Sequence, residues 1–465
     1  MSDKREISKI GQGTSSETLD YAAERDSVMH KWVRQDTFSS VFITRAAGTR
    51  LTTDTGRTIF DAFSQDWFVV AGHGRTEISD AISDQAHTLA TVHAGRFATS
   101  RRGELARRLL GKLRGDFRRI IFGANGSDAV EASLKAARLG TGRQGIIAFT
   151  KSYHGASAGA TSVTGLPQVR EGFGEPVPGT SFVPYPDCYR CPFGKSYPSC
   201  DIACADFVEE AILVEGPNRI AAIIGEPIRG SGGIAVPPDE FWPRIREIAD
   251  RHGIWLIFDE VVNGFGRTGA WFAHETVGVE PDILTLAKGL TSGYQPLSAA
   301  VLGRRAEEAL ADRPWYYGMS NQGHAVACAA AMANLNILEE EELVERATQI
   351  GDELGTRLAE LAGRHRCIGD VRGRGAMWGI ELVRHRPTKQ PFTPGEPFRD
   401  SQGNPVNVAH WAYEELFNSH DVHIGAAADV LLLAPPLITT TQEIDELVAA
   451  ISSVLKIVDE HCRDD

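Results

Sequence analysis

Two charged side chains that end apolar runs are the residues of this sequence best suited to chemistry. Asp259 follows the run Ile254 to Phe258, and Lys288 follows the run 283–287. Burying an unpaired carboxylate or ammonium is costly. An acid that holds a protonated heterocycle, together with a lysine that forms a Schiff base, would use both charges. A buried salt bridge between Asp259 and Lys288 is the alternative.

A turn between an expected strand and an expected helix supplies a place for a phosphate. In "IIFGANGSDAVEASLKAARLG" (120–140), Ser127 is the expected N-cap, and Gly126 lets another group approach the backbone closely. Free amides at such a helix start bind a phosphate monoester, because they donate hydrogen bonds at the positive end of the helix dipole. An ordinary capped turn would have the same sequence features.

The glycines of "GFGRTG" (264–269) match the dinucleotide pattern G-x-G-x-x-G, but their context does not. That pattern binds pyrophosphate where a strand leads directly into a helix. Here "AWFAHETVGVEPD" follows, with no sustained helical period. We therefore expect these glycines to form a turn without a phosphate.

A sheet must hold these residues at one edge, and the apolar runs of the sequence predict one. The expected strands are 119–124, 145–150, 220–227, 254–260, 283–287 and 297–303, with helices such as 128–139 and 240–251 between them. This alternation is typical of an α/β fold whose mainly parallel sheet is covered by helices on both faces. Ligands bind at the carboxyl edge of such sheets, where Asp259 would lie.

The two chain ends differ from this block and predict a second, smaller α+β domain. Its expected pieces are strand-like stretches at 40–48 and 58–64, a helix at 334–361, strands at 376–383 and 431–437, a surface loop at 384–405 and a final helix from Thr441. The expected boundaries assign 1–75 and 321–465 to the smaller domain and 76–320 to the larger one.

Composition and charge exclude several classes of function. A chain of 465 residues, 42% of them hydrophobic, can bury more than one full core. The formal net charge of -13 and the scatter of Lys and Arg argue against nucleic-acid binding. Residues 1–20 carry charges without an apolar core, and no stretch is long enough to cross a bilayer. We expect a cytoplasmic protein that acts on a small molecule and binds no membrane.

Seven cysteines without a secretion signal predict reduced thiols rather than a disulfide framework. Four of them cluster in "CYRCPFGKSYPSCDIAC", as Cys188, Cys191, Cys200 and Cys204. Their spacing is compatible with a structural zinc site. The interpretation that we prefer is a surface excursion that carries thiols and no metal.

Six motifs, taken in order, resemble the class III aminotransferases, which are pyridoxal-phosphate (PLP) enzymes of fold type I. They are "NGSDAVEASLKAAR", "KSYHG", "GEPIRGSGG", "FDEVVNGFGRTG", "LAKGLTSGYQPLSAAVLG" and "APPL", within residues 59–437. The resemblance implies a PLP-binding large domain and a smaller domain made by both chain ends.

The family's cofactor residues carry over one at a time. The resemblance implies that Lys288 forms the Schiff base with PLP and then moves the proton between substrate and cofactor. Asp259 would pair with the pyridinium nitrogen, so that the acids of "FDE" are assigned to the ring. Gly126 and Ser127 would hold the phosphate.

Further positions of the resemblance surround the ring. Tyr153 would stack on one face and Val261 would press on the other, while Glu226 would lie near the ring hydroxyl. We assign no chemistry to His154. Ser320 in "MSNQGHAV" stands where the family usually has a threonine that reaches the neighbouring subunit's phosphate. A homodimer, or a dimer of dimers, with the active site at the subunit interface is therefore implied.

Substrate recognition departs from the family's pattern. Members that bind a substrate carboxylate through an arginine carry it before "PPL", where this chain has Leu432, or about ten residues before "PPL", where it has Gly425. Arg229 could bind a carboxylate, sulfonate or phosphonate instead, or pair with a local acid. Trp67 matches an aromatic residue that lines the family's substrate pocket, and it could equally be a core tryptophan.

The expected reaction is a ping-pong transfer. A primary amine or ω-amino compound would pass its nitrogen to PLP, and a 2-oxo acid such as pyruvate would collect it. The cysteine cluster resembles the family branch that contains taurine:pyruvate aminotransferases. The nearer alternative is a PLP-dependent lyase or epimerase, because the missing arginines would suit an enzyme without an oxo-acid substrate. A Rossmann-type oxidoreductase and a non-catalytic descendant of the fold are more distant alternatives.

Overall fold

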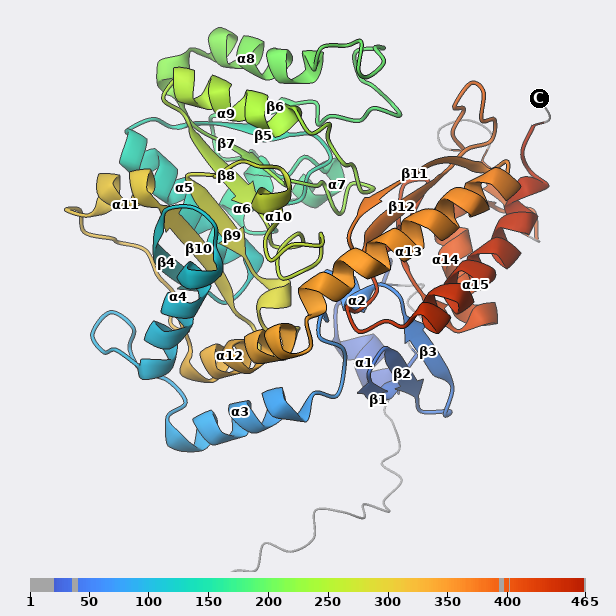
Figure 1. Ribbon diagram of the computed structural model, residues 1–465, viewed down its shortest axis with the longest axis horizontal. Coiled ribbons are helices and arrows are strands. Elements are labelled where there is room, and N and C mark those ends of the chain that lie inside the picture. The colour runs from blue at the N-terminus through green and yellow to red at the C-terminus, as the bar shows by residue number, and fades with distance from the viewer. Residues whose placement is uncertain (1–20, 36–40, 393–396, 401, 464–465) are drawn as a thin grey trace, which may run out of the picture.

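The computed structural model describes residues 21–35, 41–392, 397–400 and 402–463. A large central sheet lies between helices, and two four-stranded sheets lie beside it (Figure 1). The predicted α/β fold with a mainly parallel central sheet is confirmed. The stretch 1–20, expected to carry charges without an apolar core, lies outside the described residues.

Seven strands make the central sheet, in the order β4-β10-β9-β8-β7-β5-β6. Their bounds are β4 Phe117–Gly123, β5 Gly145–Phe149, β6 Thr180–Val183, β7 Ile220–Gly225, β8 Trp255–Asp259, β9 Ile283–Leu286 and β10 Ser298–Gly303. Strands β5 to β9 run parallel to one another, and β10 runs antiparallel to both β9 and β4. The carboxyl ends of every strand except β10 therefore meet at one edge.

All six predicted strands are present, and β6 is an additional one. The sequence reveals them because helices cover both faces of the sheet. Ile146 and Ile257 pack on one side with α5 and α11, while the next residues along each strand, Ile147 and Phe258, pack on the other side. Successive side chains of a strand point to opposite faces, so a doubly covered sheet needs near-continuous apolar runs.

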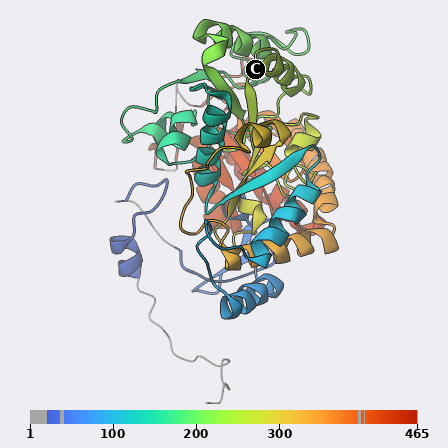
Figure 2. The same cartoon turned by 90° about the vertical axis from the view of Figure 1, so that its left-hand side faces the viewer.

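Helices on the two faces and around the smaller sheets complete the described fold (Figures 1 and 2). In chain order they are α1 Tyr21–Ser27, the short turn α2 Ser64–Trp67, α3 Thr76–Thr88, α4 Ser100–Lys112, α5 Gly126–Thr141, α6 Ala158–Val163, α7 Pro167–Arg170, α8 Ala203–Glu215, α9 Phe241–Arg251, α10 Ala273–Thr276, α11 Arg304–Leu310, α12 Ala325–Glu340, α13 Leu343–Arg364, α14 Val408–His420 and α15 Thr441–Asp459.

The smaller sheets join distant parts of the chain. One has the order β1-β2-β3-β15 and the other β11-β12-β17-β16, with a separate hairpin of β13 and β14. Their bounds are β1 Ile43–Ala47, β2 Arg50–Thr53, β3 Thr58–Asp61, β11 Ile368–Arg374, β12 Met377–Leu382, β13 Phe398–Arg399, β14 Pro405–Val406, β15 Val422–His423, β16 Gly425–Ala427 and β17 Val430–Leu433. Strand β3 pairs in parallel with β15, with Phe60 opposite Val422. This pairing is what a smaller domain built from both ends requires, and we keep boundaries near residues 75 and 320 as a proposal.

For the C-terminal part, one expectation needs correction and another gains detail. The helix predicted at 334–361 is two helices, α12 and α13, because Glu342 has φ +52 and cannot continue a right-handed helix. The described part of the stretch 384–405 lies largely at the surface, as expected, and two fully buried side chains, Phe392 and Phe398, anchor it. Its residues 393–396 and 401 lie outside the described residues.

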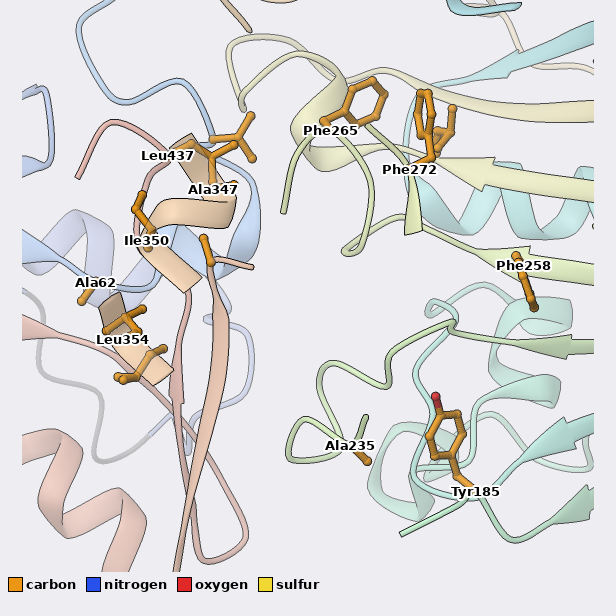
Figure 3. Close-up of a cluster of buried hydrophobic side chains, with 14 of the residues drawn as sticks. Ala62, Tyr185, Ala235, Phe258, Phe265, Phe272, Ala347, Ile350, Leu354 and Leu437 are labelled. Carbon is orange, nitrogen blue, oxygen red and sulfur yellow. The ribbon is translucent and has the colours of Figure 1, made fainter. Parts of the chain in front are cut away.

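One hydrophobic core connects the central sheet with the smaller sheets. Figure 3 shows Phe258, Phe265 and Phe272 on the central side and Ile350 and Leu437 on the other side of the same cluster. No helix in the described part of the chain is long and apolar enough to cross a membrane.

Arg267, the arginine of "GFGRTG", is fully buried and forms hydrogen bonds that link the central domain to segments of the smaller sheets. Its Nη1 donates to the carbonyl oxygens of Ala376 (3.0 Å) and Pro435 (2.6 Å), and its Nη2 donates to Ser64 Oγ (3.1 Å). The expected turn is confirmed, with Gly266 at φ +88 inside it. The motif therefore presents an arginine to three distant segments.

We expect Arg267→Met to lower the free energy of unfolding by about 3 kcal/mol or more, because it leaves the buried carbonyl oxygens of Ala376 and Pro435 without a donor. Urea unfolding at one protein concentration would measure the change. The matched control is Arg244→Met, which removes an exposed pair with Asp206 and should change the value by less than about 0.5 kcal/mol. Equal effects of the two substitutions would contradict this role of Arg267.

Candidate active site

The carboxyl edge of the central sheet gathers the charged residues that the sequence singled out. Glu226 follows β7, Asp259 ends β8, and Lys288 lies two residues after β9. These three strands are adjacent and parallel, and Asp259 lies opposite Thr285 of β9. The fold therefore places two acids and an amine at neighbouring positions of one edge.

Asp259 is buried and held by three donors. Its Oδ2 lies 2.7 Å from Nδ1 of His154, and its Oδ1 accepts hydrogen bonds from the Thr285 hydroxyl (2.9 Å) and the Val261 amide (3.1 Å). Since a carboxylate only accepts, the imidazole donates. These donors fix the orientation of the carboxylate, and Oδ2 keeps a lone pair for one further donor. The sequence alone did not reveal that His154 and Thr285 bind the Asp259 carboxylate.

Lys288 is half-buried and forms no ion pair with Asp259, so the salt-bridge alternative is wrong. Its Nζ donates to the main-chain oxygen of Asp66 at 3.1 Å. Its φ of +38 is a conformation that costs energy for any residue other than glycine and that recurs at functional sites. Burial lowers the pKa of Lys288, against the opposing effect of the Asp66 carboxylate. A lowered pKa favours the neutral amine, which is the nucleophile.

Glu226 is buried beside this edge and fixes the loop that carries Tyr153. Its Oε1 accepts a hydrogen bond from the Tyr153 amide (3.2 Å), and its Oε2 accepts one from the Gly230 amide (2.8 Å). Burial raises the pKa of Glu226, so the protonated form is favoured more than in water. The Tyr153 side chain is half-buried, and burial also raises its pKa.

Helix α5 begins at the same edge, after β4. Its N-cap is Asn125, whose side chain accepts a hydrogen bond from the Asp128 amide (3.1 Å), while Asp128 Oδ2 accepts one from the Asn125 amide (3.1 Å). The prediction that Ser127 caps this helix is wrong, because the extended backbone that a cap needs occurs at Asn125. Within the described residues, the amides of Gly126 and Ser127 have no acceptor.

Gly126 and Ser127 touch the loops on either side of the helix start. A Cβ on Gly126 would lie 3.2 Å from a methyl group of Val261. The Ser127 hydroxyl accepts a hydrogen bond from the Ala156 amide (3.1 Å), and any side chain at Gly155 would collide with that hydroxyl. The structure thus brings the predicted Gly126, Ser127 and Val261 together.

The prediction that both acids of "FDE" serve the pyridine ring of a cofactor is wrong for Glu260, which has a structural role. Its fully buried carboxylate accepts hydrogen bonds from the amides of Ala273 (2.5 Å) and His274 (2.7 Å) at the start of α10. Free amides at a helix start favour a negative charge there. Asp259 is therefore the acid of this pair that serves the sheet edge.

Trp67 and Arg229, the two expected substrate contacts, are both engaged inside the protein. Trp67 is 1% exposed and packs edge-on against Phe63, with ring centroids 4.8 Å apart. Arg229 is 2% exposed, its Nη2 lies 3.7 Å from Asp187 Oδ2, and its guanidinium lies over the Tyr185 ring. The structure favours the alternative interpretations, a core tryptophan and an arginine paired with a local acid.

The positions where family members carry arginines are filled by apolar groups. Leu432 is buried in the cluster that contains Trp67. At Gly425, any side chain would collide with the ring of Phe63. Neither position offers a cation to a substrate.

Ser320 lies exposed in the loop before α12. Within the described part of this chain, no hydrogen bond connects its side chain with the sheet edge. An exposed hydroxyl is accessible to a second subunit, so the role expected for Ser320 stays a prediction.

The four clustered cysteines line one small pocket together with Phe193 and Tyr197, and all are free thiols. Burial raises the pKa of Cys204 to about 11, so its thiol keeps the proton. No group of three His, Cys, Asp or Glu side chains among the described residues could hold a metal ion. The zinc interpretation therefore has no support in the structure.

Known proteins resemble this chain over nearly its whole length. A family model described as "Aminotransferase class-III" matches residues 32–455. The taurine–pyruvate aminotransferase of Bilophila wadsworthia is 34% identical over 454 residues, which cover 94% of this chain and 97% of that protein. The leucine/methionine racemase of Thermococcus litoralis is 37% identical over 372 residues, which cover 79% of this chain and 82% of that protein.

A solved structure also resembles the fold of this chain over nearly its whole length. It is an amine transaminase from an uncultivated Pseudomonas species in a PLP-bound form, with a TM-score of 0.85 and 34% sequence identity. The match covers 92% of this chain and 97% of that one.

We expect Lys288 in protein stripped of bound small molecules to react with a small acylating reagent at lower pH than an ordinary lysine. Burial lowers its pKa, so the reactive neutral amine forms at lower pH. Mass spectrometry of the Lys288 peptide across a pH series would give the midpoint of labelling. The control is the same peptide in urea-unfolded protein, and an equal or lower midpoint there would contradict the effect of burial.

Proposed function

The chain belongs to the class III aminotransferases, which depend on PLP, and we propose that it transfers an amino group from a primary amine or ω-amino compound to a 2-oxo acid such as pyruvate. The observation that carries the proposal is the placement of Asp259 and Lys288 at the ends of adjacent parallel strands, without an ion pair between them. The relative named for taurine and pyruvate supports this choice of donor and acceptor classes.

The groups at the sheet edge fit PLP. Asp259 Oδ2 can accept one more hydrogen bond, as a protonated ring nitrogen would supply. The Lys288 amine can condense with an aldehyde, and the unpaired amides of Gly126 and Ser127 can donate to a phosphate at the start of α5. Gly126 also leaves room where a side chain would press on Val261.

Lys288 and Asp259 would divide the proton chemistry between them. Bound PLP supplies an electron sink that lets the carbon beside the donor nitrogen lose its proton. We assign to Lys288 Nζ the removal and return of that proton, which a lowered pKa favours because more of the amine is neutral. Asp259 would hold the proton of the ring nitrogen, while His154 and Thr285 keep its carboxylate oriented.

The remaining predicted residues would position the cofactor. Tyr153 and Val261 would contact opposite faces of the ring, and Glu226 would lie beside the ring hydroxyl. In support, Glu226 binds the Tyr153 amide, and Val261 packs against Gly126 at the expected phosphate site.

A homodimer with a shared active site is part of the proposal. The exposed Ser320 would contribute its hydroxyl to the phosphate in the neighbouring subunit. We also propose a cytoplasmic location, for which the support is that all seven cysteines are free thiols.

A PLP-dependent racemase or lyase is the second candidate. It is favoured by the likeness to the leucine/methionine racemase of Thermococcus litoralis and by the apolar groups at the positions of the missing arginines. Such an enzyme needs no oxo-acid co-substrate. The two candidates therefore differ in whether pyruvate is consumed.

We expect a primary amine to bleach the visible absorbance of the bound cofactor and pyruvate to restore it, with one alanine formed for each carbonyl product. Lys288→Ala should remove this cycle, because the substitution takes away the amine that condenses with the cofactor. Absorbance spectra and chromatographic assay of alanine would measure both. Racemised substrate or released ammonia without alanine would instead establish the second candidate.

A further inference from the structure

A strained turn beside Lys288 presents a carboxylate that the cofactor does not need. The residues of α2 have left-handed backbone angles, with φ of +50 at Ser64, +48 at Gln65, +68 at Asp66 and +77 at Trp67. None of them is a glycine, for which such angles would be free of strain. Strain of this kind persists where the surrounding structure enforces it, and it is concentrated at ligand sites.

The surrounding structure holds this turn firmly. Ser64 Oγ donates to the Ala434 carbonyl (2.6 Å) and accepts from Arg267 (3.1 Å), while the Gln65 amide donates to Asp61 Oδ1 (3.1 Å). Trp67, at the end of the turn, is buried. The position of Asp66 between these anchors is therefore fixed.

The main chain of Asp66 contacts Lys288, and the side chain of Asp66 is partly exposed to solvent. Its carbonyl oxygen accepts the Lys288 hydrogen bond, and its carboxylate side chain is 45% exposed. The Asp66 carboxylate is the largest charge effect that raises the pKa of Lys288, and it also raises the pKa of Tyr153. Because the Lys288 amine contacts the main chain of Asp66, the side chain of the same residue begins next to the reacting amine.

The three positions at which a substrate-binding arginine was considered offer no free cation to oppose this charge. Arg229 is paired with Asp187, and positions 425 and 432 carry no cation. Among the described residues, Lys31 is the basic group that pairs with Asp66, at 3.1 Å from Nζ to Oδ2. Lys31 is 72% exposed, so this ion pair is solvated and weak.

We propose that Asp66 binds a second ammonium group of the amine donor, so that the preferred donors are short aliphatic diamines. The inference rests on the proposed function and deepens it by naming a donor class. Asp259 and Glu226 would be engaged with the cofactor, which leaves Asp66 as the acid for the substrate. In this interpretation Lys31, a primary alkylammonium, occupies the place that the far end of the donor takes.

In this proposal one diamine uses both the site of the Lys288 amine and the Asp66 carboxylate, one with each of its two amino groups. One amino group of the diamine replaces the Lys288 amine, whose hydrogen bond to Asp66 shows that Nζ and this turn adjoin. The other displaces Lys31 from the Asp66 carboxylate. A monoamine leaves that carboxylate with Lys31 or water, and a donor that ends in a carboxylate or sulfonate meets a like charge.

The test compares butylamine and pentylamine with the α,ω-diamines of the same lengths, with pyruvate as acceptor and the cofactor-loaded enzyme. Asp66→Asn keeps the side-chain shape and tolerates a positive φ, so the hydrogen bond from Lys288 to the main chain can remain. We expect this substitution to lower the diamine-to-monoamine ratio of kcat/KM about tenfold or more. Lys31→Ala should not lower the ratio and should raise it by up to about fivefold.

The matched control is Asp352→Asn, which removes the same charge from an exposed position on α13 and should leave the ratio unchanged. The proposal is overturned if Asp66→Asn leaves the ratio unchanged, or if β-alanine and taurine outperform diamines and lose their activity in Lys31→Ala, since Lys31 would then be the recognition group. Failure of the proposed function has a different signature, because the unaltered enzyme would then form no alanine from any donor.

Discussion

The cost of burying charge at the carboxyl edge of the central sheet is the constraint on which the rest of this structure depends. Asp259 ends β8 and Lys288 lies two residues after the adjacent strand β9, and a direct ion pair would be the simplest way to bury them. The fold instead satisfies each with other partners, His154 and Thr285 for the acid and the main chain of Asp66 for the amine. Both groups therefore stay available to a bound molecule, which an ion pair between them would prevent.

Keeping these two groups in place requires rigid surroundings, and the buried guanidinium of Arg267 contributes to them. Arg267 donates hydrogen bonds to Ala376, Pro435 and Ser64, so one guanidinium links the turn that follows β8 to the smaller sheets and to the strained turn at 64–67. The contact with Ser64 holds one end of that turn, whose residues 64–67 have left-handed backbone angles. Stability and site geometry thus depend on the same residue.

The same constraint decides the substrate side. Arg229 was a reasonable candidate for binding an anion, but a guanidinium that is 2% exposed must be paired, and Asp187 with the Tyr185 ring pairs it. Asp66 is only half-buried, so water and Lys31 suffice for it, and it keeps capacity for a ligand. Burial, rather than residue type, separates the charges that hold the protein together from those that can bind a substrate.

The sequence by itself determined six of the seven strands of the central sheet, the turn at 264–269 and the placement of an acid and a lysine at the same sheet edge. Each of these follows from local signals, namely apolar runs, glycines that permit a turn and charges that end a run. Only the tertiary structure decided that Asn125 rather than Ser127 caps α5, that Glu260 serves α10 and that His154 and Thr285 hold Asp259. It also decided that Asp66 reaches Lys288, 222 residues away in the chain. Strand register and long-range packing select these partners, and neither is encoded in the spacing of residues along one segment.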